Sequence, residues 1–243
     1  MSTAGIVIIG NEILTGKIQD ENTPYLLREL RRNGVDVPRV HVIPDVIEDI
    51  ARDVRAFSAA YDYVLTSGGV GPTHDDLTMD GVAAAFDVPL VVNEEMLGML
   101  RGALRGKEPN ASHLKMCMLP AGASLITSKD LWFPLVQMRN VFVFPGIPRL
   151  LQMKFESARE LFKGSPVYLH RVYMSLIESD IAEDLNAVVA EFQSVAFGSY
   201  PRTSAEVDYM TLLTLESRDR ELAERAAAAL VKRMPPGSVV RVE

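Results

Sequence analysis

The sequence of 243 residues has a single cysteine and no long apolar run. Cys117 cannot form an internal disulfide, and its neighbours in "KMCML" are mostly apolar with no strong base beside the thiol, so we interpret it as structural. No run approaches the roughly 18 apolar residues of a membrane helix, and the first residues lack the basic and apolar segments of a signal peptide. We therefore expect a cytoplasmic protein without a membrane partner.

Positive charge is also scarce. Lysine and arginine number 25 against 32 acidic residues, which gives a net charge of −7, so a nucleic-acid partner would need a local basic patch. The one dense basic cluster, Arg28, Arg31 and Arg32, has the spacing of a solvated helix face. The sequence therefore predicts no nucleic-acid partner.

Several familiar catalytic patterns are missing. The four histidines form no cluster with each other or with the cysteine, which argues against a zinc site. No G-x-S-x-G nucleophile elbow, no G-x-G-x-x-G dinucleotide fingerprint and no P-loop occurs. Any chemistry must therefore come from other residue types.

What the sequence does contain is a regular alternation of strand and helix patterns. Strands are expected at 4–10, 35–43, 61–66, 88–92, 123–127 and 140–146, and helices at 23–33, 47–57, 78–86, 96–105 and 148–162. Continuous apolar strands alternating with helices predict an α/β domain of three layers, a mostly parallel sheet with helices on both faces.

The pattern changes after residue 164. Strands are expected at 166–176, 195–201, 207–217 and 237–242, with helices at 179–192 and 219–234. The order βαββαβ is typical of a ferredoxin-like α+β domain. We therefore predict two domains, 1–164 and 165–243.

Four polar loops follow strands of the expected parallel sheet, at residues 10–22, 44–49, 67–76 and 145–148. Ligands of such sheets bind at the carboxyl ends of the strands. Convergence of four loops on one edge predicts the binding site there.

The third loop, "TSGGVGPTHDDLT" (66–78), carries the strongest signal. Gly68, Gly69 and Gly71 permit close approach of a ligand to the backbone, whose amides can bind phosphate with those at the helix start near Thr78. The alternative is a tight turn with an acidic residue at the helix start. Asp75 and Asp76 would repel a phosphate unless a divalent metal (Mg, Mn or Co) lay between them, so the sequence predicts a metal at these two carboxylates.

The other loops add candidate binding residues. Glu12 is placed to bind ribose hydroxyls or metal, and Asn22 to bind ligand or to cap the following helix. Asp45 also follows a strand, with helix capping as its alternative. Gly146 in "FPGIP" either leaves backbone free for a flat ligand or phosphate, or serves only the turn before Pro148.

These motifs, "GNEILTGKIQDENT", "VIPD", "TSGGVGPTHDDLT" and "PGIP" in this order, resemble the molybdopterin-binding-like domain of molybdenum cofactor biosynthesis proteins and of the competence/damage-inducible protein A family. "FPLVQMRNVFVFPGIPRLL" and "GSYP" make the sequence more similar still to the N-terminal domain of eukaryotic FAD synthase. The resemblance extends over nearly the whole chain.

In the cofactor-synthesis relatives, the resemblance implies that Asp45 and Asp76 serve adenylylation of molybdopterin and that Gly68 to Gly71 hold the pterin phosphate. In the FAD synthase and competence-protein relatives, it implies metal-dependent hydrolysis of a diphosphate linkage in FAD or ADP-ribose. It also implies a homo-oligomer, a dimer or trimer. The regions for FAD synthesis and deamidation are absent from these 243 residues, so those activities are not carried over.

The resulting hypothesis is a divalent-metal-dependent nucleotide pyrophosphatase. Asp76 and Asp45 are its expected catalytic residues, Asp75 and Asp76 its metal ligands, and the remaining candidates bind substrate. Two alternatives are a molybdopterin-binding or adenylyl-transfer protein and a non-enzymatic ligand-binding module. Each takes a small nucleotide or pterin as ligand.

Overall fold

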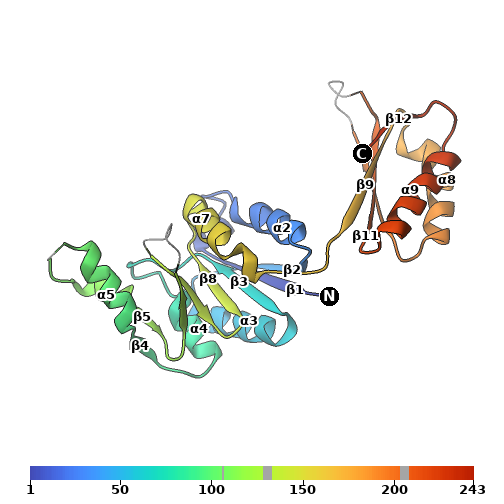
Figure 1. Ribbon diagram of the computed structural model, residues 1–243. Helices are drawn as coiled ribbons and strands as arrows, with labels where there is room; N and C mark the ends of the chain where they lie inside the picture. Colours follow the sequence, from blue (N-terminus) through green and yellow to red (C-terminus); the bar gives the residue numbers. More distant parts are fainter. Residues whose placement is uncertain (106, 128–132, 203–207) are drawn as a thin grey trace. The chain divides into compact units, whose positions relative to one another are not determined.

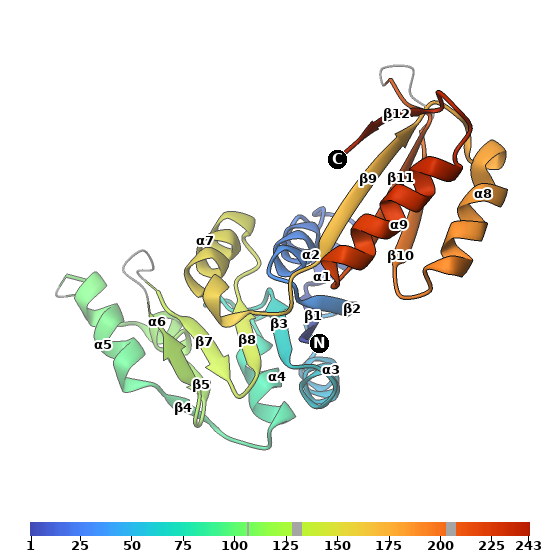
Figure 2. The ribbon, with the colours of Figure 1, turned by 45° about the vertical axis from the view of Figure 1, so that its right-hand side comes forward.

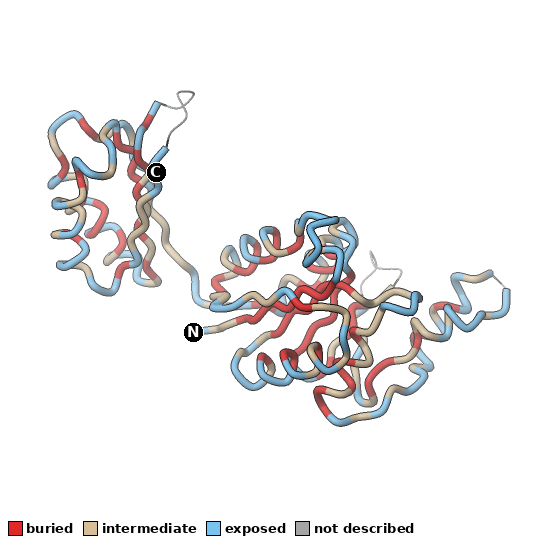
Figure 3. Tube along the Cα trace, turned by 180° about the vertical axis from the view of Figure 1, so that it is seen from behind, coloured by how far each residue is buried: buried red, intermediate tan, exposed pale blue. Residues whose placement is uncertain are grey.

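The computed structural model describes residues 1–105, 107–127, 133–202 and 208–243, which form two compact units, Met1–Gly164 and Ser165–Glu243 (Figure 1). Each unit has a buried core of its own, drawn in red in Figure 3. The strand expected over 207–217 is described from Thr211, and residue 207 lies outside the described residues.

The first unit is built on a six-stranded sheet, in the order β2-β1-β3-β8-β7-β6. The first four of these strands are parallel, whereas β7 and β6 are antiparallel to their neighbours. The mostly parallel sheet predicted from the sequence is confirmed. Its strands are β1 (Thr3–Ile9), β2 (Asp36–Ile43), β3 (Tyr63–Ser67), β6 (Ser124–Ile126), β7 (Leu135–Met138) and β8 (Val141–Phe144).

Helices cover both faces of this sheet, because successive side chains of its buried strands point to opposite sides. Ile6 and Ile8 of β1 pack in the core beneath α2 and α7, whereas Val7 and Ile9 pack in the core beneath α3 and α4. This confirms the three layers. The helices are α2 (Asn22–Arg32), α3 (Ile47–Ala60), α4 (Thr78–Ala85) and α7 (Pro148–Ala158), which a 3-10 turn, η1 (Arg159–Leu161), extends.

A smaller group of elements follows α4 in the chain and lies beside β7, at the outer side of the first unit (Figure 2). It contains a two-stranded antiparallel ribbon, β4 (Leu90–Val92) with β5 (Met118–Pro120), and the helices α5 (Glu94–Ala103) and α6 (Ala111–Lys115). The sequence patterns missed β5, β7, α6 and the short helix α1 (Asn11–Leu14), because three to five residues are too few to show a period.

One boundary differs from its expectation for a clear reason. The helix expected from residue 23 begins one residue earlier, at Asn22, with Glu21 at the N-cap position and the Asp20 side chain bound to its first turn. The Asp20 Oδ1 atom accepts the backbone N–H groups of Asn22 and Thr23 at 2.9 and 3.0 Å. The Asn22 side chain is therefore free for another task.

The second unit is a four-stranded antiparallel sheet, in the order β10-β11-β9-β12, with α8 and α9 on one face (Figure 1). The chain order is the predicted βαββαβ. Val172, Ile181, Leu213 and Leu230 are buried between sheet and helices. The elements are β9 (Tyr168–Met174), α8 (Glu178–Glu191), β10 (Ala196–Pro201), β11 (Thr211–Ser217), α9 (Arg220–Arg233) and β12 (Val239–Val242).

Within the described ranges, no helix has both the length and the apolar character needed to cross a membrane.

Candidate functional site

The site lies at the edge where the parallel strands β2, β1, β3 and β8 end. Their parallel pairing carries the four predicted loops to this one edge, in the order 44–49, 10–22, 67–76 and 145–148. The loop after β1 is partly helical, since α1 occupies its start.

The glycine loop after β3 requires its glycines. Gly68 and Gly69 have φ angles of 109° and 61°, and a Cβ atom on Gly68 would lie 2.0 Å from the Ile9 carbonyl oxygen. Among the hydrogen bonds of the described residues, none uses the backbone N–H of Gly69, Val70 or Gly71. Three donors are thus left for a ligand.

A second set of donors lies beside the first. Gly146 precedes α7, and a Cβ atom on it would lie 3.3 Å from the Gly68 Cα, so the two loops touch through their backbones. In the described part of the chain, the N–H groups of Gly146 and Ile147 have no protein acceptor either. They face the same edge as the positive end of the α7 dipole, which favours an anion.

Asn22 holds these two loops together. Its Nδ2 atom donates to the Gly146 carbonyl at 2.7 Å and to Ser67 Oγ at 2.9 Å, and Ser67 Oγ donates to the Pro145 carbonyl. The side chain is buried and absent from the cavity lining. Asn22 therefore supports the two loops from behind and does not line the cavity.

Thr73 organises the acidic end of the glycine loop. Its backbone N–H donates to Asp76 Oδ2 at 2.8 Å, and its hydroxyl lies within hydrogen-bond distance of both Asp75 and Asp76. The Nζ atom of Lys115, on α6, donates to the Thr73 carbonyl. The hydrogen bond from Thr73 lowers the pKa of the exposed Asp75 carboxyl, so Asp75 is ionised at neutral pH.

The remaining predicted residues fall into two groups. Glu12 lines the cavity with Asp76. Thr78 is fully buried and donates to the Gly68 carbonyl at 2.7 Å, so it supports the loop from beneath. Asp45 lies outside the cavity lining and accepts the Asn11 backbone N–H at 2.8 Å, which fixes α1 and hence Glu12.

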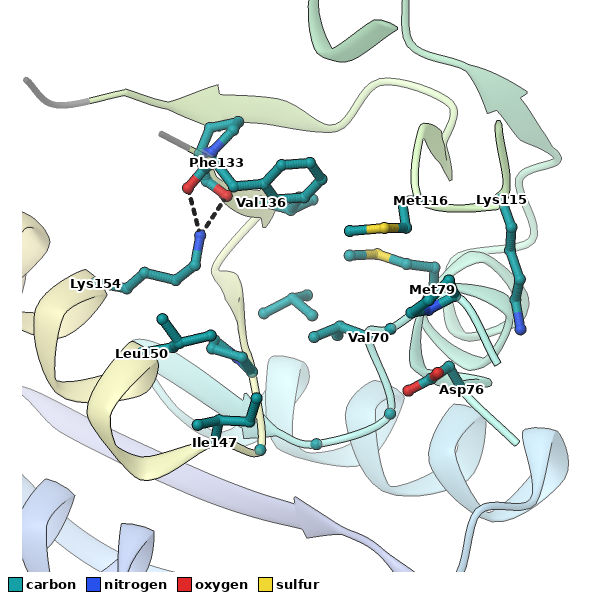
Figure 4. Close-up of a pocket in the computed structure, with 18 of the residues that line it drawn as sticks. Val70, Asp76, Met79, Lys115, Met116, Phe133, Val136, Ile147, Leu150 and Lys154 are labelled. Atoms are coloured by element: carbon teal, nitrogen blue, oxygen red, sulfur yellow. Dashed lines mark hydrogen bonds between the residues drawn. The ribbon is translucent and has the colours of Figure 1, made fainter. Parts of the chain in front are cut away.

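These loops border a cavity of about 770 Å³ (Figure 4). Besides the polar residues named above, Asp80 and Lys154, its wall is largely apolar. The sequence patterns missed this wall because its residues come from distant segments. The apolar members are Ile18, Val70, Pro72, Met79, Leu90, Met96, Met116, Met118, Phe133, Pro134, Val136, Val143, Pro145, Ile147, Pro148, Leu150 and Met153. The volume and lining suit a small organic ligand.

Lys154, on α7, is a basic group in this wall that the motifs did not indicate. Its side chain is 9% exposed, and Nζ donates to the carbonyls of Phe133 and Pro134 at 2.6 and 2.7 Å (Figure 4). Burial lowers the pKa of the Lys154 ammonium to about 8.

The positions of Asp75 and Asp76 suit a metal ion that is bound jointly by the protein and by a ligand. Among the described residues, no three histidine, cysteine or acidic side chains gather into a group able to hold a metal alone. Mg²⁺ commonly binds through one or two carboxylates together with substrate phosphates. Asp75 and Asp76 meet at Thr73 beside the free amides, so they fit this second arrangement.

Comparison with known proteins gives two matches that together extend over most of the chain. Residues 5–162 match the family described as a probable molybdopterin binding domain. Residues 166–243 match the family described as FAD synthase, middle domain.

Individual relatives agree with these matches. A probable FAD synthase of Caenorhabditis briggsae is 34% identical over 98% of this chain and 50% of its own length. A CinA-like protein of Myxococcus xanthus is 32% identical over 93% of this chain and 56% of its own length. The chain thus spans about half the length of these curated relatives.

Among solved structures, the protein CinA of Thermoplasma acidophilum, of unknown function, superposes with a TM-score of 0.62 at 26% identity. The match extends over 66% of this chain and 98% of that one. Together these findings confirm the resemblance predicted from the motifs.

Proposed function

The chain belongs to the family described as a probable molybdopterin binding domain, and its second unit matches the FAD synthase middle domain, so we propose that its first unit hydrolyses a dinucleotide diphosphate linkage. The substrate is FAD or ADP-ribose, the products are two monophosphates, and the reaction depends on a divalent metal.

One observation carries this proposal: free amides and carboxylates lie together at one end of an apolar cavity. Gly69, Val70 and Gly71 offer N–H donors, and a Cβ atom on Gly71 would lie 2.7 Å from Asp76 Oδ2. A site for a simple anion would not place a carboxylate against its donors, because the charges repel. A diphosphate with a bound cation satisfies both groups.

The residues then divide the work. The amides of the glycine loop hold one phosphate and those of Gly146 and Ile147 the other, while Lys115 contributes positive charge at the acidic end. A divalent cation held by Asp76 and Asp75 would neutralise the phosphate charge that develops in the reaction. Asp76 also orients the attacking water.

The reaction exchanges one bond for another. The water oxygen bonds to one phosphorus, and the bond from that phosphorus to the bridging oxygen breaks. The bridging oxygen keeps the electron pair and leaves as part of the second monophosphate. Of the two protons of the water, one passes to solvent and the other stays on a product phosphate or follows it, according to pH. The oriented amides stabilise the charge on the leaving phosphate.

The main test is product analysis. The protein is incubated with FAD or ADP-ribose and Mg²⁺, Mn²⁺ or Co²⁺, with a chelator control, and AMP is measured by chromatography. We expect AMP only with metal. Asp76→Asn should lose turnover by at least about a hundredfold yet stay folded, since an amide oxygen can still accept from Thr73.

Asp87→Asn is the matched control. Asp87 is exposed and does not line the cavity, and it forms an ion pair with Arg55 at 3.2 Å. Its φ of 55° is one that asparagine tolerates. We expect unchanged turnover in this variant. Turnover of Asp76→Asn at the wild-type rate would overturn the assignment.

Molybdopterin binding or adenylyl transfer is the second candidate, because the same amides suit the terminal phosphate of a pterin and the matched family is described as molybdopterin binding. Adenylylation of molybdopterin with FAD and ADP-ribose left intact would favour it. Tight binding of either nucleotide with no turnover in any metal would favour a non-enzymatic module.

A further inference from the structure

Lys154 is a buried cation to which the proposed hydrolysis gives no role. An ammonium group has three N–H donors, and two of them bind the carbonyls of Phe133 and Pro134. No acceptor for the third exists among the described residues. Because Lys154 belongs to the cavity lining, that third donor is available to a ligand in the cavity.

The wall beside Lys154 is suited to a flat ring. The Phe133 ring centroid lies 5.7 Å from Nζ, and Met79, Met116 and Val136 point toward the same space (Figure 4). Five of the eleven methionines line the cavity, and their polarisable sulfur atoms make favourable contacts with aromatic rings.

The helix α7 fixes the spacing between this wall and the phosphate-binding loops. Ile147 caps the helix beside the free amides, and Lys154 follows seven residues later, about 10 Å along the axis at 1.5 Å per residue. Leu150 and Met153 line the cavity between them. One rigid element thus presents phosphate donors at its start and a cationic donor further along.

We propose that this part of the cavity is a subsite for a flat fused ring with carbonyl oxygens on its edge, and that Lys154 donates its third hydrogen bond to one of those oxygens. The inference rests on the proposed function, since a flavin here is the ring of FAD, whereas a pterin belongs to the second candidate function. Flavin and pterin share this carbonyl edge. Adenine has no ring carbonyl: its amino group only donates, and its acceptors are ring nitrogens flanked by that donor, so it fits a cationic donor less well.

The charge state of Lys154 supports this assignment. With a pKa lowered to about 8 by burial, the ammonium remains mostly protonated at neutral pH. A buried charge is costly unless its donors are satisfied. A ring carbonyl would be the third acceptor for Lys154. Its hydrogen bond with this charged donor would be stronger than one with a neutral donor.

The test measures binding of phosphate-free probes to the full chain without metal. Equilibrium dialysis compares riboflavin, neopterin and adenosine. We expect riboflavin or neopterin to bind roughly tenfold more tightly than adenosine, and the tighter of the two identifies the ring. Adenosine binding as tight as both would overturn the inference.

Lys154→Met keeps the apolar stem and removes the donor. We expect it to lose roughly tenfold in affinity for the preferred ring and nothing for adenosine. Lys163→Met is the control, because Lys163 is exposed, pairs with Glu160 and lies outside the cavity. Unchanged ring affinity in Lys154→Met would overturn the inference, and the wild-type ranking decides it if this variant does not fold.

The two proposals fail separately. Ring binding that depends on Lys154, without release of AMP from FAD or ADP-ribose in the presence of any of the metals, would refute the proposed hydrolase and support the proposed ring subsite. Metal-dependent AMP release with adenosine bound as tightly as riboflavin and neopterin would refute the proposed ring subsite and support the proposed hydrolase.

Discussion

Gly68 carries the closest backbone approach in the site. Its φ of 109° and the Ile9 carbonyl oxygen, 2.0 Å from where a Cβ atom would lie, leave no room for a side chain. We expect Gly68→Ala to destabilise the protein by more than about 2 kcal/mol and to abolish phosphate binding, because the loop must move. Urea unfolding and dialysis with inorganic phosphate measure the two effects.

Gly98→Ala is the matched control for this change. Gly98 lies exposed inside α5, and a Cβ atom there meets nothing within 4 Å. The same substitution should therefore stabilise the protein by about 0.5–1 kcal/mol, because alanine favours a helix. Equal effects of the two substitutions would refute the steric account of Gly68.

Lys154 also predicts a pH dependence of stability. Its pKa is about 8 in the folded protein and about 10.5 when exposed, so between these values the unfolded chain binds more protons. The free energy of unfolding of the wild type, relative to Lys154→Met, should rise with pH in this window by at most about 1.4 kcal/mol per unit. If the difference in the free energy of unfolding between the two proteins did not change from pH 7 to 10, the burial of the Lys154 charge would be contradicted.

Single residues of the candidate site were predictable from the sequence where they lie close together in it. Gly68, Gly69, Gly71 and Asp76 lie within nine positions, so their loop was predictable from one motif, and the structure brings them together. Lys154 was not predictable, since it resembles any lysine of an amphipathic helix until Phe133 and Pro134 fold against it.

At the scale of elements, α2 is fastened to the α7 segment at both ends by an asparagine. Asn22 donates to the Gly146 carbonyl before α7, and Asn33 donates to the carbonyls of Arg159 and Phe162 after it. Only the first pair touches the binding edge. Substitution at the two ends can therefore separate stability from binding.

We expect Asn22→Ala and Asn33→Ala each to lower the free energy of unfolding by about 1–3 kcal/mol, since each leaves acceptors unpaired. Only Asn22→Ala should also weaken phosphate binding, because the glycine loop and the loop at Gly146 lose their common support. Chemical unfolding and phosphate dialysis on both variants test this. Weaker binding in Asn33→Ala alone would show that the loops respond to another element.

Elements were predictable in proportion to their length. The long helices and buried strands of both sheets follow the expected patterns within a few residues, because each spans several periods. The strands β5 and β7 were missed because they are three and four residues long and show no period, and the partner of β5, β4, lies far back in the sequence. The apolar wall of the cavity depends on these elements, so it was missed with them.

At the scale of the whole molecule, each compact unit has a core of its own. All the residues of the candidate site belong to Met1–Gly164. We therefore expect a chain of residues 1–164 to fold and to release AMP from its substrate within about threefold of the full-length rate. Circular dichroism and the AMP assay measure this.

The separate chain 165–243 is the companion experiment. It should fold by circular dichroism, because the two helices cover one face of its sheet, and it should release no AMP. AMP release that needs both units, with each of them folded, would refute the assignment of catalysis to the first unit alone.

The hydrogen bonds from Asn22 to Ser67 and Gly146 also affect the entropy of ligand binding. The two loops with free amides belong to segments about 80 positions apart, yet their spacing is already set when the chain has folded. The proposed diphosphate ligand would therefore bind without ordering either loop, and little conformational entropy would be lost on association. Evolution could tune affinity at this edge through the first turn of α2, without altering any residue that the ligand touches.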